Sequence, residues 1–367
     1  MTLKTESFIL NIGPQHPSTH GVFRLRATLD GEIMTDVDPV FGYLHRGLEK
    51  LMEGRSYKEN IPLTDRLDYV SAINNNWPYV LAFEKLAGIS VPARAEYIRV
   101  IMGELQRVAS HLLAAGSLMN DMGAFYTPFM YMFREREKII DLLSMVTGQR
   151  LLYNFMRFGG VSHDLPEEFF PAVDKFLKTM PGFLDEYDRL LAGNEILLAR
   201  TKGVGRLSPQ TAINTSASGP VLRGSTIPWD IRKVDPYSVY DKFEFDVPVG
   251  VIGDTYDRFR VRLAEIRESL RIIRQAVEQL PDGKTINPVA LHYRPPRGEA
   301  YAQVEAPRGT LGCYLVSDGS EKPYRCHFRA PALLNLSAIR ELLIGQKLSD
   351  AIIIFGSIDI SMGEVDR

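Results

Sequence analysis

The sequence predicts an α+β fold in which a central bundle of long helices is flanked by small β-containing regions at both ends of the chain. Three observations predict this class. Apolar and polar residues alternate up to residue 42, apolar residues then recur at helical spacing as far as residue 280, and short strand-like segments return after residue 310. We therefore expect a β-rich region over 1–62, a helical bundle over 63–285 and an α+β region over 286–367.

The composition is that of a globular protein, with 45% hydrophobic and 24% charged residues among 367. Its 43 basic and 45 acidic side chains argue against a nucleic-acid binder that relies on bulk positive charge. Two cysteines cannot stabilise a secreted domain, so we expect a reducing compartment. No apolar run approaches the roughly 20 residues that span a bilayer, and no signal-peptide core begins the sequence. We expect a soluble chain, with a peripheral place on a membrane complex left open.

The N-terminal region is predicted to contain a β-hairpin that follows a rigid loop. Val22–Leu29 alternates, an Asp-Gly pair at 30–31 is a strong turn signal, and Glu32–Val40 continues as the partner strand. The loop Gly13–Gly21 contains two prolines and two histidines, which is typical of neither a helix nor a strand. Taken alone, its histidines fit either exposed turn residues or functional groups.

The middle of the chain shows helical spacing and helix-boundary signals. Trp77-Pro78 is expected to interrupt one helix, and Pro181 to break or kink another. The expected helices are Leu44–Met52, Leu63–Leu86, Arg94–Leu118, Arg134–Phe155, a helix that begins at Asp164 and Pro166, and Asp254–Leu280.

The last region returns to shorter elements. Gly312–Val316 and Tyr324–Arg329 flank a Ser-Asp-Gly-Ser turn and predict a hairpin. Ala338–Gln346 is expected to be a short helix and Ala351–Ser357 a buried strand. The stretch Ile286–Glu299, rich in proline, is expected to be a long connection between regions.

Common cofactor motifs are missing from the sequence. It contains no Walker A motif, dinucleotide fingerprint, GxSxG or HExxH. Cys313 and Cys326 are isolated and fit two small buried apolar residues. An iron–sulfur cluster normally takes four thiolates or an equivalent ligand set. We therefore expect neither a metal nor a cofactor in this chain.

Several strings along the whole chain are far more specific. They are Gly13–Gly21, Gly42–Lys50, Arg134–Glu137, Phe158–Val161 and Ser361–Arg367. Together they resemble the 49 kDa-type subunits, also called D-type subunits, of respiratory complex I, the proton-translocating NADH:quinone oxidoreductase. That family is in turn similar to the large subunits of nickel–iron hydrogenases, so the resemblance implies a hydrogenase large-subunit-like fold.

The hydrogenase similarity implies a metal site that has been lost. Hydrogenases hold one metal pair with two Cys-x-x-Cys motifs, and the matching stretches here are Arg66–Ser71 and Asp359–Glu364. Carboxylates and hydroxyls cannot replace thiolates for nickel and iron in such a site. Because both stretches matched one centre, we expect their backbones to lie within about 10 Å. The four vestigial ligand positions are Asp68, Ser71, Ser361 and Glu364.

The resemblance implies that a quinone head-group fills the vacated cavity, with His20 and Tyr69 as its ligands. A quinone that gains two electrons needs two protons, and an imidazole with a pKa of about 6.5 and a phenol with a pKa of about 10 can supply them. Asp121 resembles the family's acid that orients this histidine and favours its charged form. Taken alone, Tyr69 fits a core tyrosine and Asp121 a helix-end cap. The implied quinone-binding set is His16, His20, Tyr69, Asp359, Ser361, Met362 and Val365.

The resemblance also implies the partners. Arg66 is similar to a family arginine close to the terminal iron–sulfur cluster of the adjoining small subunit. His163 lies in a region near that cluster, although it fits a surface loop histidine as well. Iron–sulfur clusters and any flavin belong to partner subunits. The implied neighbours are the B-type iron–sulfur small subunit, the C-type and I-type subunits, and the H-type membrane subunit, with the chain placed peripherally on the cytoplasmic face of the cell membrane.

Three functions remain compatible with these residues. The first is the quinone-reducing subunit of an NADH:quinone oxidoreductase, active only within its complex. The second is a subunit without hydrogenase activity in a membrane complex fed by ferredoxin or formate. The third is a purely structural or assembly subunit, which predicts that His20 and Tyr69 tolerate change.

Overall fold

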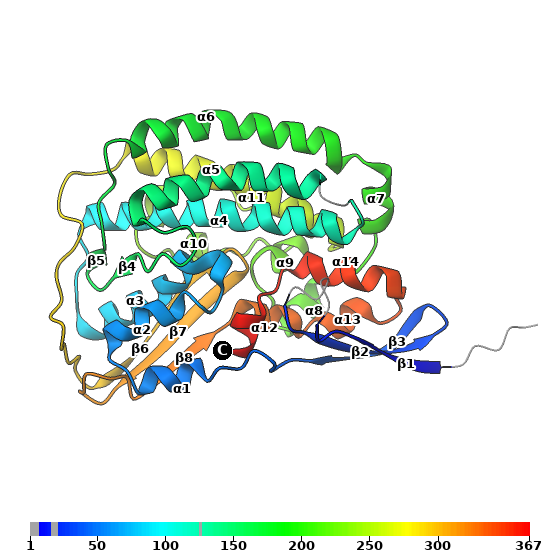
Figure 1. Cartoon of the computed structure of the whole chain (residues 1–367), viewed down its shortest axis with the longest axis horizontal. Helices are drawn as coiled ribbons and strands as arrows, with labels where there is room; N and C mark the ends of the chain where they lie inside the picture. The colour runs from blue at the N-terminus through cyan, green and yellow to red at the C-terminus, as the bar shows by residue number, and fades with distance from the viewer. Residues whose placement is uncertain (1–6, 16–20, 125–126) are drawn as a thin grey trace, which may run out of the picture.

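The computed structural model describes residues 7–15, 21–124 and 127–367. Long helices stack on one side of the molecule and small sheets lie on the other (Figure 1), so the expected α+β class with a long-helix bundle is confirmed. The strands are β1 (Ser7–Ile12), β2 (Arg24–Asp30), β3 (Ile33–Val40), β4 (Met156–Arg157), β5 (Gly160–Val161), β6 (Gly298–Ala306), β7 (Gly309–Ser317) and β8 (Arg325–Arg329). The helices are α1 (Leu48–Glu53), α2 (Tyr57–Thr64), η2 (Tyr69–Ser71), α3 (Ala72–Ala87), α4 (Ala93–Asp121), α5 (Thr127–Thr147), α6 (Phe169–Tyr187), η3 (Asp188–Ala192), α7 (Glu195–Thr201), α8 (Pro209–Asn214), α9 (Gly219–Gly224), α10 (Ile231–Val234), η4 (Tyr240–Lys242), α11 (Thr255–Glu278), α12 (Pro331–Leu336), α13 (Ile339–Leu343), α14 (Leu348–Ile358) and α15 (Met362–Asp366).

The N-terminal sheet contains the expected hairpin. Strands β1, β2 and β3 are antiparallel and adjacent in that order, and the turn between β2 and β3 contains Gly31 at a φ of 61°. A positive φ is readily adopted only by glycine, which explains the Asp-Gly signal. Alternate residues of β2 are buried, namely Leu25, Ala27 and Leu29. They join an apolar cluster with residues of α13 and α14.

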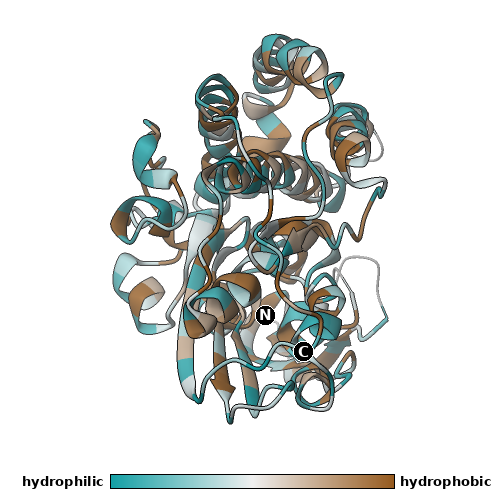
Figure 2. Ribbon diagram, turned by 90° about the vertical axis from the view of Figure 1, so that its left-hand side faces the viewer, coloured by the Kyte–Doolittle hydropathy of each residue, from teal (hydrophilic) through white to brown (hydrophobic). Residues whose placement is uncertain are grey.

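The bundle is built around α4. This 29-residue helix packs against α5 and α11, and α6 packs against these two helices in turn (Figure 1). Asp254 caps α11 by accepting a hydrogen bond from the Asp257 amide at 2.8 Å. Figure 2 shows that most helices carry both hydrophobic and hydrophilic residues, as expected for helices that bury one face. The expected helices Arg94–Leu118 and Asp254–Leu280 are both confirmed.

The C-terminal sheet has one strand more than expected. The hairpin of β7 and β8 is confirmed, but β6 pairs with the other edge of β7 and was missed. Its buried positions alternate only partly and its outward positions include Tyr301 and Gln303, so the strand pattern is weak. Helix α3 packs across β6 and β7.

The prediction of a strand at Ala351–Ser357 is wrong, because this segment lies within helix α14. The segment contains three consecutive isoleucines, and most of its side chains are buried, in contact with both α4 and α11. A short apolar run that is buried on nearly every side has no periodicity that separates a strand from a helix. Tertiary burial decided the conformation here, against the β propensity of isoleucine.

The expected effects of two prolines are also wrong. Helix α3 continues through Pro78, and α6 continues through Pro181 to residue 187. A proline inside a helix costs about 3 kcal/mol through the lost hydrogen bond and a steric clash. Both helices bury a large apolar face that offsets this cost, with Trp77 and Pro78 both buried.

The bounds of several expected helices shift. The helix expected over Leu63–Leu86 begins at Ala72, after η2, and the helix expected over Leu44–Met52 begins at Leu48. Helix α5 ends at Thr147 rather than 155, because Gly148 follows at a φ of 71° and its amide bonds the Ser144 carbonyl at 2.8 Å. Helix α6 begins only at Phe169. Asp164 does not cap it, but accepts hydrogen bonds from Arg94 and from the Leu165 amide.

Candidate functional site

A cavity of about 210 Å³ lies where four distant parts of the chain meet. Tyr69 lines it at the start of η2, Leu113 and Ser117 line it from α4, and Arg308 lines it from the β6–β7 turn. The segment between α14 and α15 closes another side. The full described lining is Gly21, Leu44, Asp68, Tyr69, Val70, Leu113, Ser117, Arg308, Asp359, Ile360, Ser361, Met362 and Gly363.

The two stretches expected to be neighbours meet at this cavity. A Cβ atom placed on Gly363 would lie 2.9 Å from the carbonyl oxygen of Leu67 and 3.3 Å from that of Arg66. The backbones therefore touch, although the segments lie at opposite ends of the chain. Only glycine allows this approach without a shift of the backbone.

Arg308 joins the same two stretches by ion pairs. Its guanidinium group donates to Asp68 Oδ2, to the Asp359 carbonyl oxygen at 2.8 Å and to Asp359 Oδ1 at 3.2 Å. Burial opposes the charge of Arg308, but Asp359 and Asp68 outweigh it and raise the arginine pKa. A charged arginine thus lies between Asp68 and Asp359, one from each of the two stretches that the hydrogenase similarity matches.

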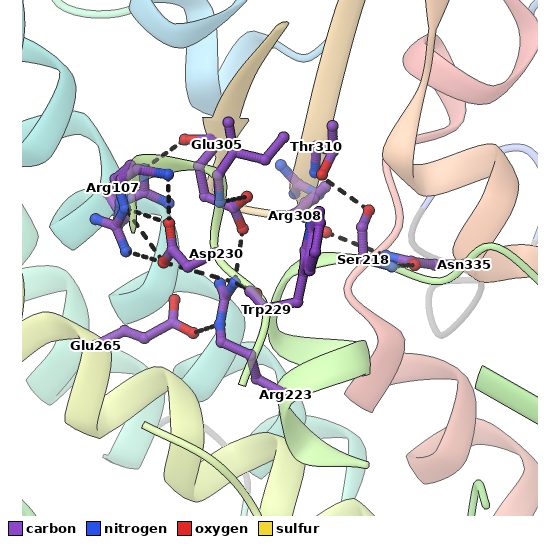
Figure 3. A network of polar contacts seen from close by, with 12 residues as sticks. Arg107, Ser218, Arg223, Trp229, Asp230, Glu265, Glu305, Arg308, Thr310 and Asn335 are labelled. Carbon is purple, nitrogen blue, oxygen red and sulfur yellow. Dashed lines mark hydrogen bonds and ion pairs between the residues drawn. The ribbon is translucent and has the colours of Figure 1, made fainter. Parts of the chain in front are cut away.

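The turn that carries Arg308 is held by the start of α9 and by Asn335 of α12. Asn335 donates from Nδ2 to the Arg308 carbonyl at 3.0 Å, and Ser218 Oγ accepts from the Thr310 amide at 3.1 Å (Figure 3). Gly219 has a φ of 66°, and a Cβ atom there would lie 2.5 Å from Gly309 Cα and 2.6 Å from the Arg308 oxygen. The position of Arg308 therefore depends on a glycine in a neighbouring element.

We expect Gly219→Ala to destabilise the chain by about 3 kcal/mol or more, from the left-handed backbone plus the clash with the Arg308 turn. Gly88→Ala is the matched control, because Gly88 has the same φ of 66° and nothing lies within 4 Å of its Cβ position. That control is expected to cost only about 1 kcal/mol. Denaturant unfolding of both variants measures the difference, and equal losses would show that the turn tolerates displacement.

A buried ionic network supports the strand that leads to this turn. Arg223 of α9 donates to Glu265 of α11 at 2.6 Å and to Glu305 of β6 at 2.7 Å, and Figure 3 shows it between them. Burial opposes ionisation of Glu265, but Arg223 outweighs it and lowers the carboxyl pKa. His111 of α4 meets Glu265 at 2.9 Å, and burial lowers the imidazole pKa. The network therefore connects the bundle helices α4 and α11 with α9 and with the end of β6, just before Arg308.

Tyr69, the predicted head-group ligand, is placed at the cavity. It is 58% exposed, although most of its neighbours in the chain are buried. Asp121 ends α4, one helical turn beyond Ser117 and two beyond Leu113, so all three occupy one face of that helix. Asp121 is half-buried and does not border the cavity itself.

The other quinone-site candidates divide into three groups. Asp359, Ser361 and Met362 line the cavity. The side chain of Val365 belongs instead to the apolar cluster formed with β2, α13 and α14. His16 and His20 lie outside the described residues.

The two residues expected near a partner cluster are both exposed, and neither lines the cavity. Arg66 donates to the Pro62 carbonyl, and its own carbonyl accepts from Arg46 at 2.8 Å. His163 follows β5 and contacts Ser162 Oγ at 3.0 Å.

The four positions predicted to be vestigial metal ligands are all buried. Asp68 is paired with Arg308, and no described residue bonds the hydroxyl of Ser71. Ser361 lines the cavity and Glu364 lies just beyond it. Within 7–15, 21–124 and 127–367, no group of three or more His, Cys, Asp or Glu side chains is placed to hold a metal ion.

Two residues with structural importance for the site were missed in the sequence. Arg308 is one, and its only signal is a Pro-Arg-Gly turn between strands. Asp366 is the other. Its carboxylate accepts from the amides of Gly42 and Leu44, both at 2.8 Å, which docks α15 onto the N-terminal loop beside the cavity. Neither partner is near in the sequence, so no local pattern reveals these contacts.

A larger cavity of about 380 Å³ lies elsewhere, between α2, the β4 segment and the 286–289 connection. Lys58 and Arg157 line it together with apolar residues, and burial lowers the pKa of both cations. It contains none of the predicted site residues. A larger volume does not by itself indicate a reaction, so the smaller cavity, which contains the predicted residues, is the better candidate for the functional site.

Among the residues that the structure describes, no helix is long and apolar enough to cross a membrane.

Comparisons with known proteins agree with this architecture. The family model described as the 49 kDa subunit of respiratory-chain NADH dehydrogenase matches residues 121–293 and 285–367. A protein of Dehalococcoides mccartyi, named as the D-type subunit of NADH-quinone oxidoreductase, is 63% identical over 367 residues, which is 100% of both chains. Proteins from a Roseiflexus species and from Desulforamulus reducens, both named as D-type subunits of the same enzyme, are each 54% identical and cover 100% of both chains. The chain therefore belongs to the family of 49 kDa subunits of the respiratory-chain NADH dehydrogenase.

Proposed function

We propose that this chain is the quinone-reducing subunit of a proton-translocating NADH:quinone oxidoreductase, and that the cavity at Tyr69 receives the quinone head-group. The observation that carries the proposal is the exposed phenol of Tyr69 at a cavity whose other wall is the Asp359–Gly363 segment. The full-length relatives, which are named for a reaction between NADH and quinone, support it.

The lining has the chemistry that a quinone ring requires. Leu44, Val70, Leu113 and Met362 offer an apolar surface, and Tyr69 offers a hydroxyl donor. Charge develops on the carbonyl oxygens during reduction, and a hydrogen bond from the phenol stabilises it. Arg308 in the cavity lining adds positive charge that favours the reduced, more negative ligand.

The second ligand in the proposal is His20, with Asp121 as the acid that tunes it. Asp121 occupies the helix face that also lines the cavity, which supports a place for it at the same site. A histidine beside a carboxylate is held in its charged form, so it carries at neutral pH the proton that the reduced quinone requires. His16 belongs to the same loop and is proposed as a further contact.

The proposal includes a partner that completes the cavity. A volume of about 210 Å³ is below the roughly 300–1,000 Å³ typical of ligand pockets. A B-type iron–sulfur small subunit would supply the rest of the wall and the electrons, with Arg66 and His163 facing its terminal cluster. Flavin and iron–sulfur clusters would lie in partners, with C-type, I-type and H-type subunits adjoining, and the chain would sit peripherally on the cytoplasmic face of the membrane.

Thiol protection in the assembled complex tests this proposal. Ser117→Cys places one thiol in the cavity wall, while both native cysteines of the chain are buried. A short-chain quinone at ten times its dissociation constant should slow maleimide labelling of this thiol about tenfold. Ser349→Cys, at an exposed site at the start of α14, is the control and should label equally fast with or without quinone. Labelling at Ser117→Cys that quinone leaves unchanged would place the head-group elsewhere.

A further inference from the structure

Glu364 is a buried carboxyl group that the proposed quinone chemistry leaves unused. It lies on α15, two residues beyond the cavity-lining Met362, and its side chain is 2% exposed. No described residue forms a hydrogen bond with its Oε1 atom. A buried carboxylate without a full set of hydrogen bonds is costly, whereas the protonated acid is tolerated.

The groups around Glu364 come from several elements. Asp68, just before η2, is the acid that raises the pKa of Glu364, and Arg308 of the β6–β7 turn and Arg367 lower it. Arg329, at the end of β8, also interacts electrostatically with Glu364, which raises the arginine pKa against the effect of burial. These arginines are engaged elsewhere, since Arg329 donates to the Thr310 carbonyl and Arg367 to that of Phe328. Glu364 therefore faces one acid and several cations whose hydrogen bonds go to other groups.

The balance of these effects favours a neutral Glu364. Burial is the largest cause and Asp68 the second, and together they outweigh Arg308 and the Ala332 amide and raise the pKa of Glu364 to about 8. Burial likewise raises the pKa of Asp68, although Arg308 pairs with it. A pKa of about 8 keeps most of the Glu364 carboxyl groups protonated at neutral pH.

We propose that Glu364 stores a proton for quinone reduction and delivers it to the cavity through Asp68. This inference rests on the proposed quinone site. Asp68 is the link, because it lines the cavity and follows Leu67, whose carbonyl oxygen lies 2.9 Å from the Cβ position of Gly363, the residue before Glu364. Glu364 touches neither substrate nor cavity, so it is a positioning residue that acts through Asp68.

The step is balanced. The quinone takes two electrons from the iron–sulfur donor of the complex and two protons, and its two carbonyl oxygens become hydroxyls. One proton comes from the ligand side of the cavity, at Tyr69 or His20. The other leaves the Glu364 carboxyl by way of Asp68, so Glu364 becomes a carboxylate and later regains a proton from water.

Glu364→Gln in the assembled complex tests the inference. The amide keeps the shape and neutrality of the protonated acid but cannot release a proton. Donor:quinone activity should fall by about tenfold or more at pH 7, with KM for quinone within about twofold of wild type. Electron transfer to an artificial acceptor that bypasses the quinone site should be unchanged. Glu278→Gln, which removes an exposed carboxyl at the end of α11, should leave both activities unchanged.

The pH profile separates proton storage from a merely structural role. A raised pKa means that the store is full below about pH 8 and empties as the pH rises through it, so wild-type quinone activity should decline above that pH. Glu364→Gln should lack this alkaline decline. Infrared difference spectra of the complex should show a carboxylic-acid band at pH 7 that disappears on titration and is missing in Glu364→Gln. Glu364→Asp, which retains a carboxyl group, should partly restore activity and the decline.

Each outcome supports or overturns the proposal. Quinone activity within twofold of wild type for Glu364→Gln at every pH, an unchanged alkaline decline, or no titrating acid band would overturn it. If Glu364→Gln fails to assemble, the pH profile of Glu364→Asp and the titrating acid band of the wild-type complex still test the proposal. A loss of quinone activity in Tyr69→Phe but not in Glu364→Gln rejects the proton store alone, whereas no loss in either rejects the quinone site.

Discussion

Arg308→Met is expected to destabilise the chain by about 3–5 kcal/mol, because it leaves buried carboxylates without their cation. Asp68 and Asp359 both lie within hydrogen-bond reach of the guanidinium group, and methionine offers neither charge nor donors. The two carboxylates would then repel each other across the seam between the η2 and α15 segments. The cavity wall is expected to open at this seam, so quinone activity should be lost together with stability.

The defect should depend on pH in a defined direction. Burial raises the pKa values of Asp68 and Glu364 and Arg308 lowers them, so without Arg308 both rise further above their unfolded values. Stability that such acids contribute is present at low pH and is lost as the pH rises through the folded-state pKa. The difference in unfolding free energy between wild type and Arg308→Met should therefore be larger at pH 9 than at pH 5.

Urea unfolding of the full chain at both pH values measures this difference. Arg308→Lys is the matched control, since it keeps the charge but cannot bridge two carboxylates, and it should lose less stability. Adding Asp359→Asn to Arg308→Met should restore part of the loss. A loss below about 1 kcal/mol at both pH values would mean that the ion pairs contribute no more than exposed ones.

Much of the fold could be predicted because its main elements are locally encoded. The stripe along α4 repeats over many turns, and the Asp-Gly turn between β2 and β3 needs only a glycine at positive φ. Caps such as Asp254 act within four residues. Each of these signals depends on neighbours in the sequence, so no knowledge of the tertiary structure is required.

The errors occur where tertiary contacts override the local pattern. The isoleucines of α14 are buried on nearly every side and show no periodicity, so the sequence pattern alone does not distinguish a helix from a strand. Pro78 and Pro181 are accommodated because the helices that contain them are firmly packed. Strand β6 carries polar residues on its outward positions, which hides its alternation.

The candidate site shows the same division. The resemblance to hydrogenases correctly brought the Arg66–Ser71 and Asp359–Glu364 stretches together, because both matched ligand motifs of a single centre. Arg308 and Asp366 could not be found this way. Their partners lie 51 to 324 residues away in the sequence, so only the folded chain reveals the contacts.

Tyr69→Phe is expected to reduce donor:quinone activity about tenfold to a hundredfold while the complex still assembles. The phenol is exposed at the cavity, so the loss of its hydroxyl leaves packing almost unchanged. A hydrogen bond to a group that becomes charged contributes roughly 1.5–3 kcal/mol, which corresponds to this range when it acts in the transition state.

His20→Ala should have an effect of similar size, because the proposal assigns it the second carbonyl and a proton. The double variant should lose less than the product of the two single effects, since both ligands serve one substrate. Asp121→Asn should be milder, because its proposed role is to tune His20 rather than to contact the quinone.

The ratio of two activities in Tyr69→Phe tests the quinone cavity most directly. One is electron transfer from the donor to quinone, and the other is electron transfer to an artificial acceptor that bypasses the quinone site, both in assembled complex with normal subunit content. We predict that quinone activity falls at least tenfold while the bypass activity stays within twofold of wild type. Quinone activity within twofold of wild type in both Tyr69→Phe and His20→Ala would contradict the account and leave a structural role for this chain.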